Sequence, residues 1–146
     1  MMRTRCIGCR PTRRECRRVL APGGRVILVY NSRDEAAACT QALAALRRKF
    51  DPAFYGFSNG ISDERCRAFF AGACKVFRAD NPQVYDRQGY VDRVLSSSYS
   101  LKESDGRYAA YLEEIHAIFD RCAENGKIVI PTATVAYVGA YSAVGE

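Results

Sequence analysis

The sequence lacks any hydrophobic run long enough to cross a membrane. Its longest strongly apolar stretch is Val26–Tyr30, whereas a transmembrane helix needs about 20 apolar residues. The basic start Met1–Arg5 is not followed by the apolar stretch of about 7–15 residues that a secretory signal requires. We therefore expect a cytoplasmic protein without a membrane partner.

Histidine is also scarce, and this limits metal binding. The only histidine is His116, and the seven cysteines are scattered along the chain, at positions 6, 9, 16, 39, 66, 74 and 122. Cys6, Cys9 and Cys16 could supply three thiolates, but a structural zinc site takes four ligands in paired spacing. We expect no metal site, and reduced cysteines of which several are buried as small hydrophobic side chains.

Positive charge is confined to the start of the chain. Residues 1–25 carry eight arginines and one acidic residue, whereas the other 121 residues carry 14 basic and 15 acidic side chains. A basic arm of this kind can bind phosphates. Because neither interleaved aromatic residues nor a known reading element accompanies it, nucleic acid is not an expected partner. We interpret residues 1–12 as an irregular basic leader.

Length and composition are those of one globular domain. The chain has 146 residues, of which 48% are hydrophobic and 26% are charged, as in ordinary folded proteins. A chain of this size buries about 68% of the surface that its unfolded form exposes, which is enough for a real core.

Strand and helix patterns alternate along the chain and predict an α/β fold. The predicted strands are Arg25–Asn31, Lys75–Arg78, Gln83–Tyr85 and a final strand over Lys127–Tyr141 that Pro131 interrupts. The predicted helices are Arg13–Leu20, Asp34–Phe50, a helix capped by Ser62, a helix capped by Asp86, and Asp105–Ala123. Arg25–Asn31 is apolar on both faces, which predicts a strand buried in a parallel sheet with both faces covered.

Three segments carry a resemblance to a known family. Arg18-Val-Leu-Ala-Pro-Gly-Gly24 before an apolar strand resembles the "RVLkPGG" region of class I S-adenosylmethionine-dependent methyltransferases. The other two segments are the run Phe69-Phe70, Val76-Phe77, Asn81-Pro82-Gln83, Arg93 and Leu95-Ser-Ser-Ser-Tyr99, and the Tyr108–Cys122 helix with the closing strand Thr134–Gly139. The resemblance covers about residues 13–141.

Only the C-terminal half of that family is matched. A strand followed by a Gly-rich turn and a helix would take the cofactor, and no such turn occurs here. The resemblance therefore implies that residues 13–146 form a partial Rossmann-like methyltransferase fold, with about three C-terminal strands and flanking helices. The cofactor-binding half is absent. We interpret the chain as a truncated, split or frame-shifted product, or as a small variant with a role of its own.

Four residues are candidates for lining a substrate site. Asn31 and Arg33 follow the strand Arg25–Asn31 at its carboxyl end, where α/β sheets bind ligands, and the resemblance places them near the methyl acceptor. Ser98 and Tyr99 belong to the serine run, and Tyr99 is the only one of these residues suited to acid–base work. The alternatives are that Asn31 caps a helix, that Arg33 is solvated, and that the serines end a helix. The catalytic residues stay unassigned.

Two functions are compatible with this sequence. The first is a methyltransferase that uses S-adenosylmethionine and a small-molecule acceptor, with little or no activity as this chain alone and without tight cofactor binding. The second is a non-catalytic interaction module or complementing fragment, which would associate through an exposed sheet edge. The partner would then be a second copy of the chain or a separate N-terminal half.

Overall fold

The computed structural model describes residues 15–16, 18–57, 61–71 and 73–140. The chain divides into two compact units. Unit 1 contains Met1–Tyr30, Gly60–Ala79 and Thr134–Glu146, and unit 2 contains Asn31–Asn59 and Asp80–Ala133. The predicted leader over residues 1–12, together with Cys6 and Cys9, lies outside the described residues.

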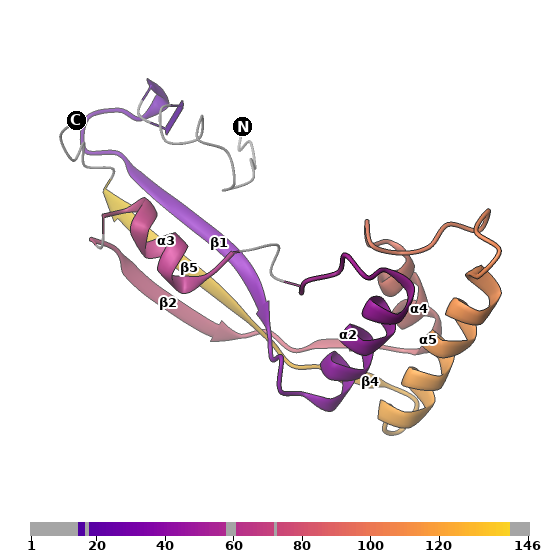
Figure 1. Cartoon of the computed structure of the whole chain (residues 1–146). Coiled ribbons are helices and arrows are strands. Elements are labelled where there is room, and N and C mark those ends of the chain that lie inside the picture. Colours follow the sequence, from indigo (N-terminus) through magenta and orange to yellow (C-terminus); the bar gives the residue numbers. More distant parts are fainter. Residues whose placement is uncertain (1–14, 17, 58–60, 72, 141–146) are drawn as a thin grey trace. The chain divides into compact units, whose positions relative to one another are not determined.

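A three-stranded antiparallel sheet runs through unit 1 (Figure 1). Its strands are β1 (Arg25–Arg33), β2 (Lys75–Asp80) and β5 (Thr132–Ala140), in the order β1-β5-β2. The prediction that the first strand is buried in a parallel sheet, with both faces covered, is wrong. Leu28 is buried, whereas Ile27 and Val29 are 53% and 58% exposed. The reason is that β1 pairs with an antiparallel strand and has only one covered face.

The covered face of this sheet packs against the short helix α3 (Asp63–Phe69), which lies over the sheet in Figure 1. Ser62 caps the helix as predicted, because its Oγ accepts a hydrogen bond from the backbone N–H of Arg65 at 3.1 Å. Buried residues from the helix and the strands form the core of unit 1: Leu28, Cys66, Phe69, Phe70, Val135 and Tyr137.

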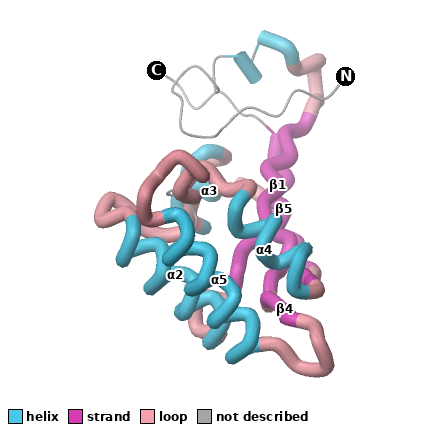
Figure 2. Tube along the Cα trace, turned by 90° about the vertical axis from the view of Figure 1, so that its right-hand side faces the viewer, coloured by secondary structure: helices cyan, strands magenta, loops and turns pink. Residues whose placement is uncertain are grey.

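Unit 2 is built from three helices and a two-stranded antiparallel sheet (Figure 2). The helices are α2 (Ala38–Phe50), α4 (Arg87–Leu95) and α5 (Tyr108–Cys122). The sheet pairs β3 (Gln83–Tyr85) with β4 (Ile128–Ile130). Helices α2 and α5 lie side by side in both views, and their apolar faces meet in the core of this unit.

Two helices begin later than the hydrophobic pattern predicts. The first predicted residue of α2 was Asp34, but its carboxylate accepts a hydrogen bond from the N–H of Ala36, and the helix starts at Ala38. The first predicted residue of α5 was Asp105, but its carboxylate accepts from the N–H of Arg107, and the helix starts at Tyr108. In both places the aspartate stabilises a turn that competes with helix formation.

Turn residues behave as their chemistry predicts. Gly23 adopts a φ of +76°, and the N–H of Gly24 donates to the carbonyl of Ala21, which closes the turn before β1. Asn125 and Gly126, with φ of 50° and 74°, follow α5. Pro131 separates β4 from β5, so the long final strand is in fact two strands.

The described part of the chain is therefore a mixed α/β structure with a three-stranded antiparallel sheet. The residues placed in the structure contain no helix that combines the length and the apolar character needed to cross a membrane.

Candidate functional site

The four predicted site residues lie in unit 2 and differ in burial. Asn31 and Arg33 belong to the end of β1, and Ser98 and Tyr99 follow α4. Asn31 and Ser98 are exposed, whereas Arg33 and Tyr99 are partly buried. The alternative interpretation that Arg33 is solvated therefore holds only in part.

Aromatic residues in the loop after α2 connect Arg33 with Tyr99. The guanidinium of Arg33 lies over the ring of Phe57, 4.6 Å from its centroid, a cation–π arrangement. Phe57 packs edge-on against Phe54 at 5.1 Å, and Phe54 packs edge-on against Tyr99 at 5.4 Å. The structure thus brings two of the four predicted residues to one aromatic loop.

Tyr99 is poorly suited to act as a base. Burial and a hydrogen bond with Tyr55 raise the pKa of its phenol above the ordinary value. A phenol with a raised pKa stays protonated near neutral pH, whereas a general base must lose its proton there. Tyr99 can pack against a ligand, but its surroundings do not favour proton abstraction.

Arg33 has two further arginines as neighbours. Burial lowers its pKa most strongly, and the charges of Arg93 in α4 and Arg47 in α2 lower it further. The Nη1 atom of Arg33 is buried without a hydrogen-bond partner. The charges of three arginines, from β1, α2 and α4, therefore act on one another.

Arg47 is the most buried of these arginines, with only 2% of its surface exposed. Its Nη1 donates to Ser100 Oγ at 3.0 Å and its Nη2 donates to the carbonyl of Val94 at 2.8 Å, and both acceptors are neutral. Its Nε is buried without a partner. Burial lowers the pKa of Arg47, and the carboxylate of Asp51 opposes this less than the phenols of Tyr111 and Tyr90 do.

Tyr90 completes what we call the arginine cluster: Arg33, Arg47, Tyr90 and Arg93. Its side chain is 1% exposed, and its hydroxyl is buried without a hydrogen-bond partner. Burial raises the pKa of Tyr90, while the nearby charges of Arg33 and Arg47 act in the opposite direction. The cluster therefore combines excess positive charge with unmet hydrogen-bonding capacity.

Sequence reasoning did not single out Arg47 or Tyr90 for this cluster. The signal for Arg47 is its spacing. It lies four residues after Leu43 and three before Phe50, so it falls on the apolar stripe of its own helix. A charged residue on such a stripe is rare unless it has a partner. Arg93 was noted only as part of a family motif.

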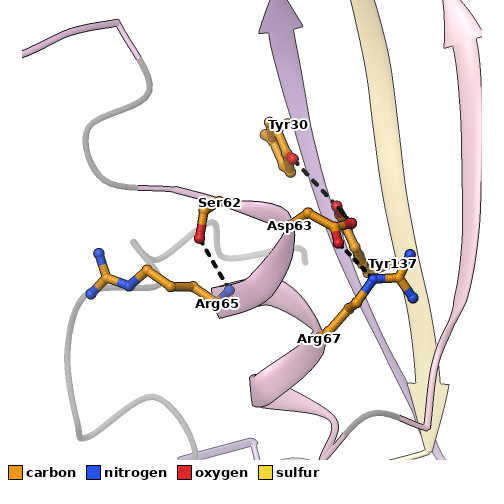
Figure 3. Close-up of polar contacts among 6 residues, drawn as sticks. All are labelled: Tyr30, Ser62, Asp63, Arg65, Arg67 and Tyr137. Carbon is orange, nitrogen blue, oxygen red and sulfur yellow. Dashed lines mark hydrogen bonds and ion pairs between the residues drawn. The ribbon is translucent and has the colours of Figure 1, made fainter.

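A second polar cluster lies in unit 1, and its hydrogen bonds close on themselves (Figure 3). Tyr137 donates to Asp63 Oδ1 at 2.6 Å, and the hydroxyls of Tyr30 and Tyr137 are 3.4 Å apart. Asp63 Oδ2 accepts from Arg67 Nε at 2.7 Å. Because these groups form hydrogen bonds with one another, we interpret this cluster as a structural link between α3 and the sheet rather than as a ligand site.

The five cysteines that the structure describes form no comparable site. Cys16, Cys39, Cys66, Cys74 and Cys122 are free thiols, and burial raises the pKa of the Cys66 thiol, which makes it less reactive. Within the described residues, no group of three or more His, Cys, Asp or Glu side chains is placed to hold a metal ion.

Neither a family model nor a curated protein matches the chain.

Proposed function

We propose that this chain is a member of the class I S-adenosylmethionine-dependent methyltransferase family that carries the half of the domain facing a small-molecule methyl acceptor. By itself it has little or no activity. The support from sequence is the resemblance of Arg18–Gly24 and of Leu95–Tyr99 to family motifs. The five free thiols among the described residues fit a reducing compartment, and we propose the cytoplasm.

The observation that supports this proposal most directly is the position of Arg33. It is the last residue of β1, it is half-buried, and it lies over Phe57 beside other polar and aromatic side chains. Methyl transfer from a sulfonium depends mainly on holding donor and acceptor in line, so a site that positions an acceptor without a base is compatible with it.

The residues of this chain do not fit the cofactor. The family's cofactor site needs a glycine-rich turn between a strand and a helix, where the backbone can approach the ligand closely. Here the connection from β1 to α2 includes residues 34–37, which are Asp-Glu-Ala-Ala. An acidic connection without glycine offers neither close backbone approach nor attraction for an anionic carboxylate of the cofactor.

Isothermal titration calorimetry with S-adenosylmethionine and with its demethylated product tests the proposal that the chain alone does not bind the cofactor. We expect no binding at micromolar concentrations of either ligand. The DNA upstream of the codon for Arg13 should encode, in another frame, a strand and a Gly-rich turn before a helix. Joining that frame to residues 13–146 should produce a protein that binds the cofactor. Micromolar binding by the chain alone, or a joined protein that folds without binding, would contradict the proposal.

The alternative function is association through the edge of the sheet. In the order β1-β5-β2, β1 is an edge strand, and its segment Val26–Tyr30 is uncharged with Ile27 and Val29 exposed. An uncharged apolar edge is a template for pairing with another chain. We propose this role for a chain that derives from a methyltransferase but has no catalytic activity.

Light scattering after size-exclusion chromatography tests the alternative. We expect the chain to associate, and Val29→Lys to shift it toward the monomer because a lysine on an edge strand opposes pairing. Val84→Lys is the matched control, because Val84 is a similarly exposed valine but belongs to β3 in unit 2. A monodisperse monomer of the unaltered chain would overturn this alternative.

A further inference from the structure

Exposed arginines and the buried Arg47 differ in the charge of the groups that accept their hydrogen bonds. Four arginines with largely exposed side chains have carboxylate partners: Arg18 with Glu15, Arg67 with Asp63, Arg87 with Asp120, and Arg107 with Asp105. Arg47 is nearly fully buried, and its acceptors within the described part of the chain are both neutral. Burial of an unpaired charge is strongly unfavourable, whereas an exposed charge needs no partner.

The polar atoms left unsatisfied in the arginine cluster can all donate a hydrogen bond. Arg33 Nη1, Arg47 Nε and Tyr90 Oη are buried and have no hydrogen-bond partner among the residues that the structure describes. Guanidinium nitrogens can only donate, and a tyrosine hydroxyl can donate as well. A ligand that satisfies them must therefore present acceptor oxygens, and an ionised oxygen gives shorter and stronger hydrogen bonds than a neutral one.

The positive charge of the cluster also favours a negatively charged ligand group. Arg93 lies close enough to lower the pKa of both Arg33 and Arg47, so the three guanidinium groups repel each other. The neighbouring side chains from the other elements are mainly the phenols Tyr85, Tyr90 and Tyr111, with Asp51 as a weak opposing charge on Arg47. A negative group placed here would relieve the repulsion.

Aromatic rings hold two of the guanidinium groups by their faces. Phe57 lies under Arg33 at 4.6 Å, and Tyr111 faces Arg47 at 5.8 Å. Stacking on the face leaves N–H groups at the edge of a guanidinium for recognition of a carboxylate or a phosphate. In Arg33 these include Nη1, whereas in Arg47 they are reduced to Nε, because Nη1 and Nη2 already donate to Ser100 and Val94.

We propose that the arginine cluster is a binding site for the carboxylate or phosphate group of a small molecule, with Arg33, Arg47 and Arg93 as its charged ligands and Tyr90 as a further donor. This deepens the proposed function, because the methyl acceptor would then be an anionic small molecule. Only that last step rests on the methyltransferase proposal, since anion binding needs no methyl transfer.

Nuclear magnetic resonance of the full chain tests the site directly. Titration with inorganic phosphate and, separately, with succinate is followed through the Nε–H signals of arginine, with sodium chloride at matched ionic strength as the reference. We expect a saturable shift of the Arg47 Nε–H signal with at least one of the two anions. The two titrations distinguish a phosphate site from a carboxylate site.

Variants that keep the fold decide between specific binding and general charge effects. Arg93 is exposed, so Arg93→Gln should fold, and we expect it to weaken anion binding about tenfold, as loss of one charge-assisted hydrogen bond does. Arg33→Gln should weaken binding at least as much. Arg107→Gln, which removes an exposed arginine paired with Asp105, is the control and should leave binding unchanged.

The proposal is overturned if neither anion gives a saturable shift beyond that of chloride, or if Arg33→Gln and Arg93→Gln bind as tightly as the unaltered chain. Failure of the methyltransferase proposal has a different signature. In that case anion binding and its dependence on Arg33 persist, whereas the joined reading frame does not bind S-adenosylmethionine.

Discussion

The phenol of Tyr137 in β5 donates a hydrogen bond to Asp63 Oδ1 over 2.6 Å and so ties the last strand to the first turn of α3, 74 residues earlier in the chain. The tyrosine side chain is 1% exposed. This bond links α3 directly to the sheet (Figure 3).

Replacing Tyr137 with phenylalanine should destabilise unit 1. The substitution removes one hydrogen bond from a buried hydroxyl, which contributes about 1 kcal/mol to the free energy of unfolding. Urea unfolding followed by fluorescence measures the loss as a lower midpoint. Tyr108→Phe is the control, because Tyr108 is only partly buried at the start of α5, and it should leave the midpoint unchanged.

The same variant should change the dependence of stability on alkaline pH. Burial and the bond to Asp63 raise the pKa of Tyr137 in the folded state, whereas an unfolded tyrosine titrates near about 10. The folded state therefore binds the Tyr137 proton more tightly than the unfolded state does. The protonated phenol makes its full contribution to the free energy of unfolding below about pH 10, and this contribution is lost as the pH rises above that value. Unfolding midpoints above pH 10 should fall less steeply for Tyr137→Phe than for the unaltered chain, and equal slopes would contradict this.

Asp105 should titrate at unusually low pH. Hydrogen bonds from the side chain and backbone of Arg107 lower the pKa of this carboxyl to about 2. Its stabilising effect is present above the unfolded value of about 3.9 and is lost as the pH falls through the folded pKa of about 2. Carboxyl titration by nuclear magnetic resonance measures this value. In Arg107→Gln the pKa should rise toward 3.9, and an unchanged pKa would show that Arg107 is not its cause.

Gly139 should not tolerate even one methyl group. A Cβ at this position of β5 would lie 2.5 Å from Phe70 Cδ1 and 2.9 Å from the carbonyl oxygen of Ala73. Gly139→Ala should therefore cost about 1–3 kcal/mol through overpacking. Gly106→Ala is the matched control, because a Cβ there meets nothing within 4 Å. Thermal unfolding of both variants measures the difference, and equal melting temperatures would contradict the packing at Gly139.

Loss of the hydroxyl should affect the free energy of unfolding differently at Tyr90 and at Tyr137. Both tyrosines are 1% exposed, but Tyr90 Oη has no hydrogen-bond partner. Tyr90→Phe should leave the free energy of unfolding unchanged or raise it by about 1 kcal/mol, because it removes an unsatisfied buried polar group. The same variant should weaken the binding of the anion. Urea unfolding in the absence of phosphate measures the first effect, and a clear loss of stability would contradict the assignment.

Local structure was largely predictable from the sequence. Ser62 and Asp86 cap their helices as predicted, with hydrogen bonds to the N–H groups three residues later. Pro131 ends a strand because it has no N–H to donate. The starts of α2 and α5 were predicted too early, because hydrophobic spacing does not show that Asp34 and Asp105 form turns with their own neighbours.

The pairing of β1 was not predictable in this way. Its apolar run is compatible with burial on both faces, but the direction and number of its neighbours depend on segments more than 100 residues away. β5 returns antiparallel beside β1, and α3 covers one face only, which leaves Ile27 and Val29 exposed.

The sequence by itself determined where turns, caps and most strands occur, because these depend on side chains acting on backbone groups a few residues away. It also directed attention to Arg33 and Tyr99 through their place after a strand and after a helix. Only the tertiary structure decided that Arg33, Arg47, Tyr90 and Arg93 from three elements act on one another, with no carboxylate in an ion pair with them among the described residues. Burial and long-range packing set the charge balance of such a cluster, and neither is encoded in local spacing.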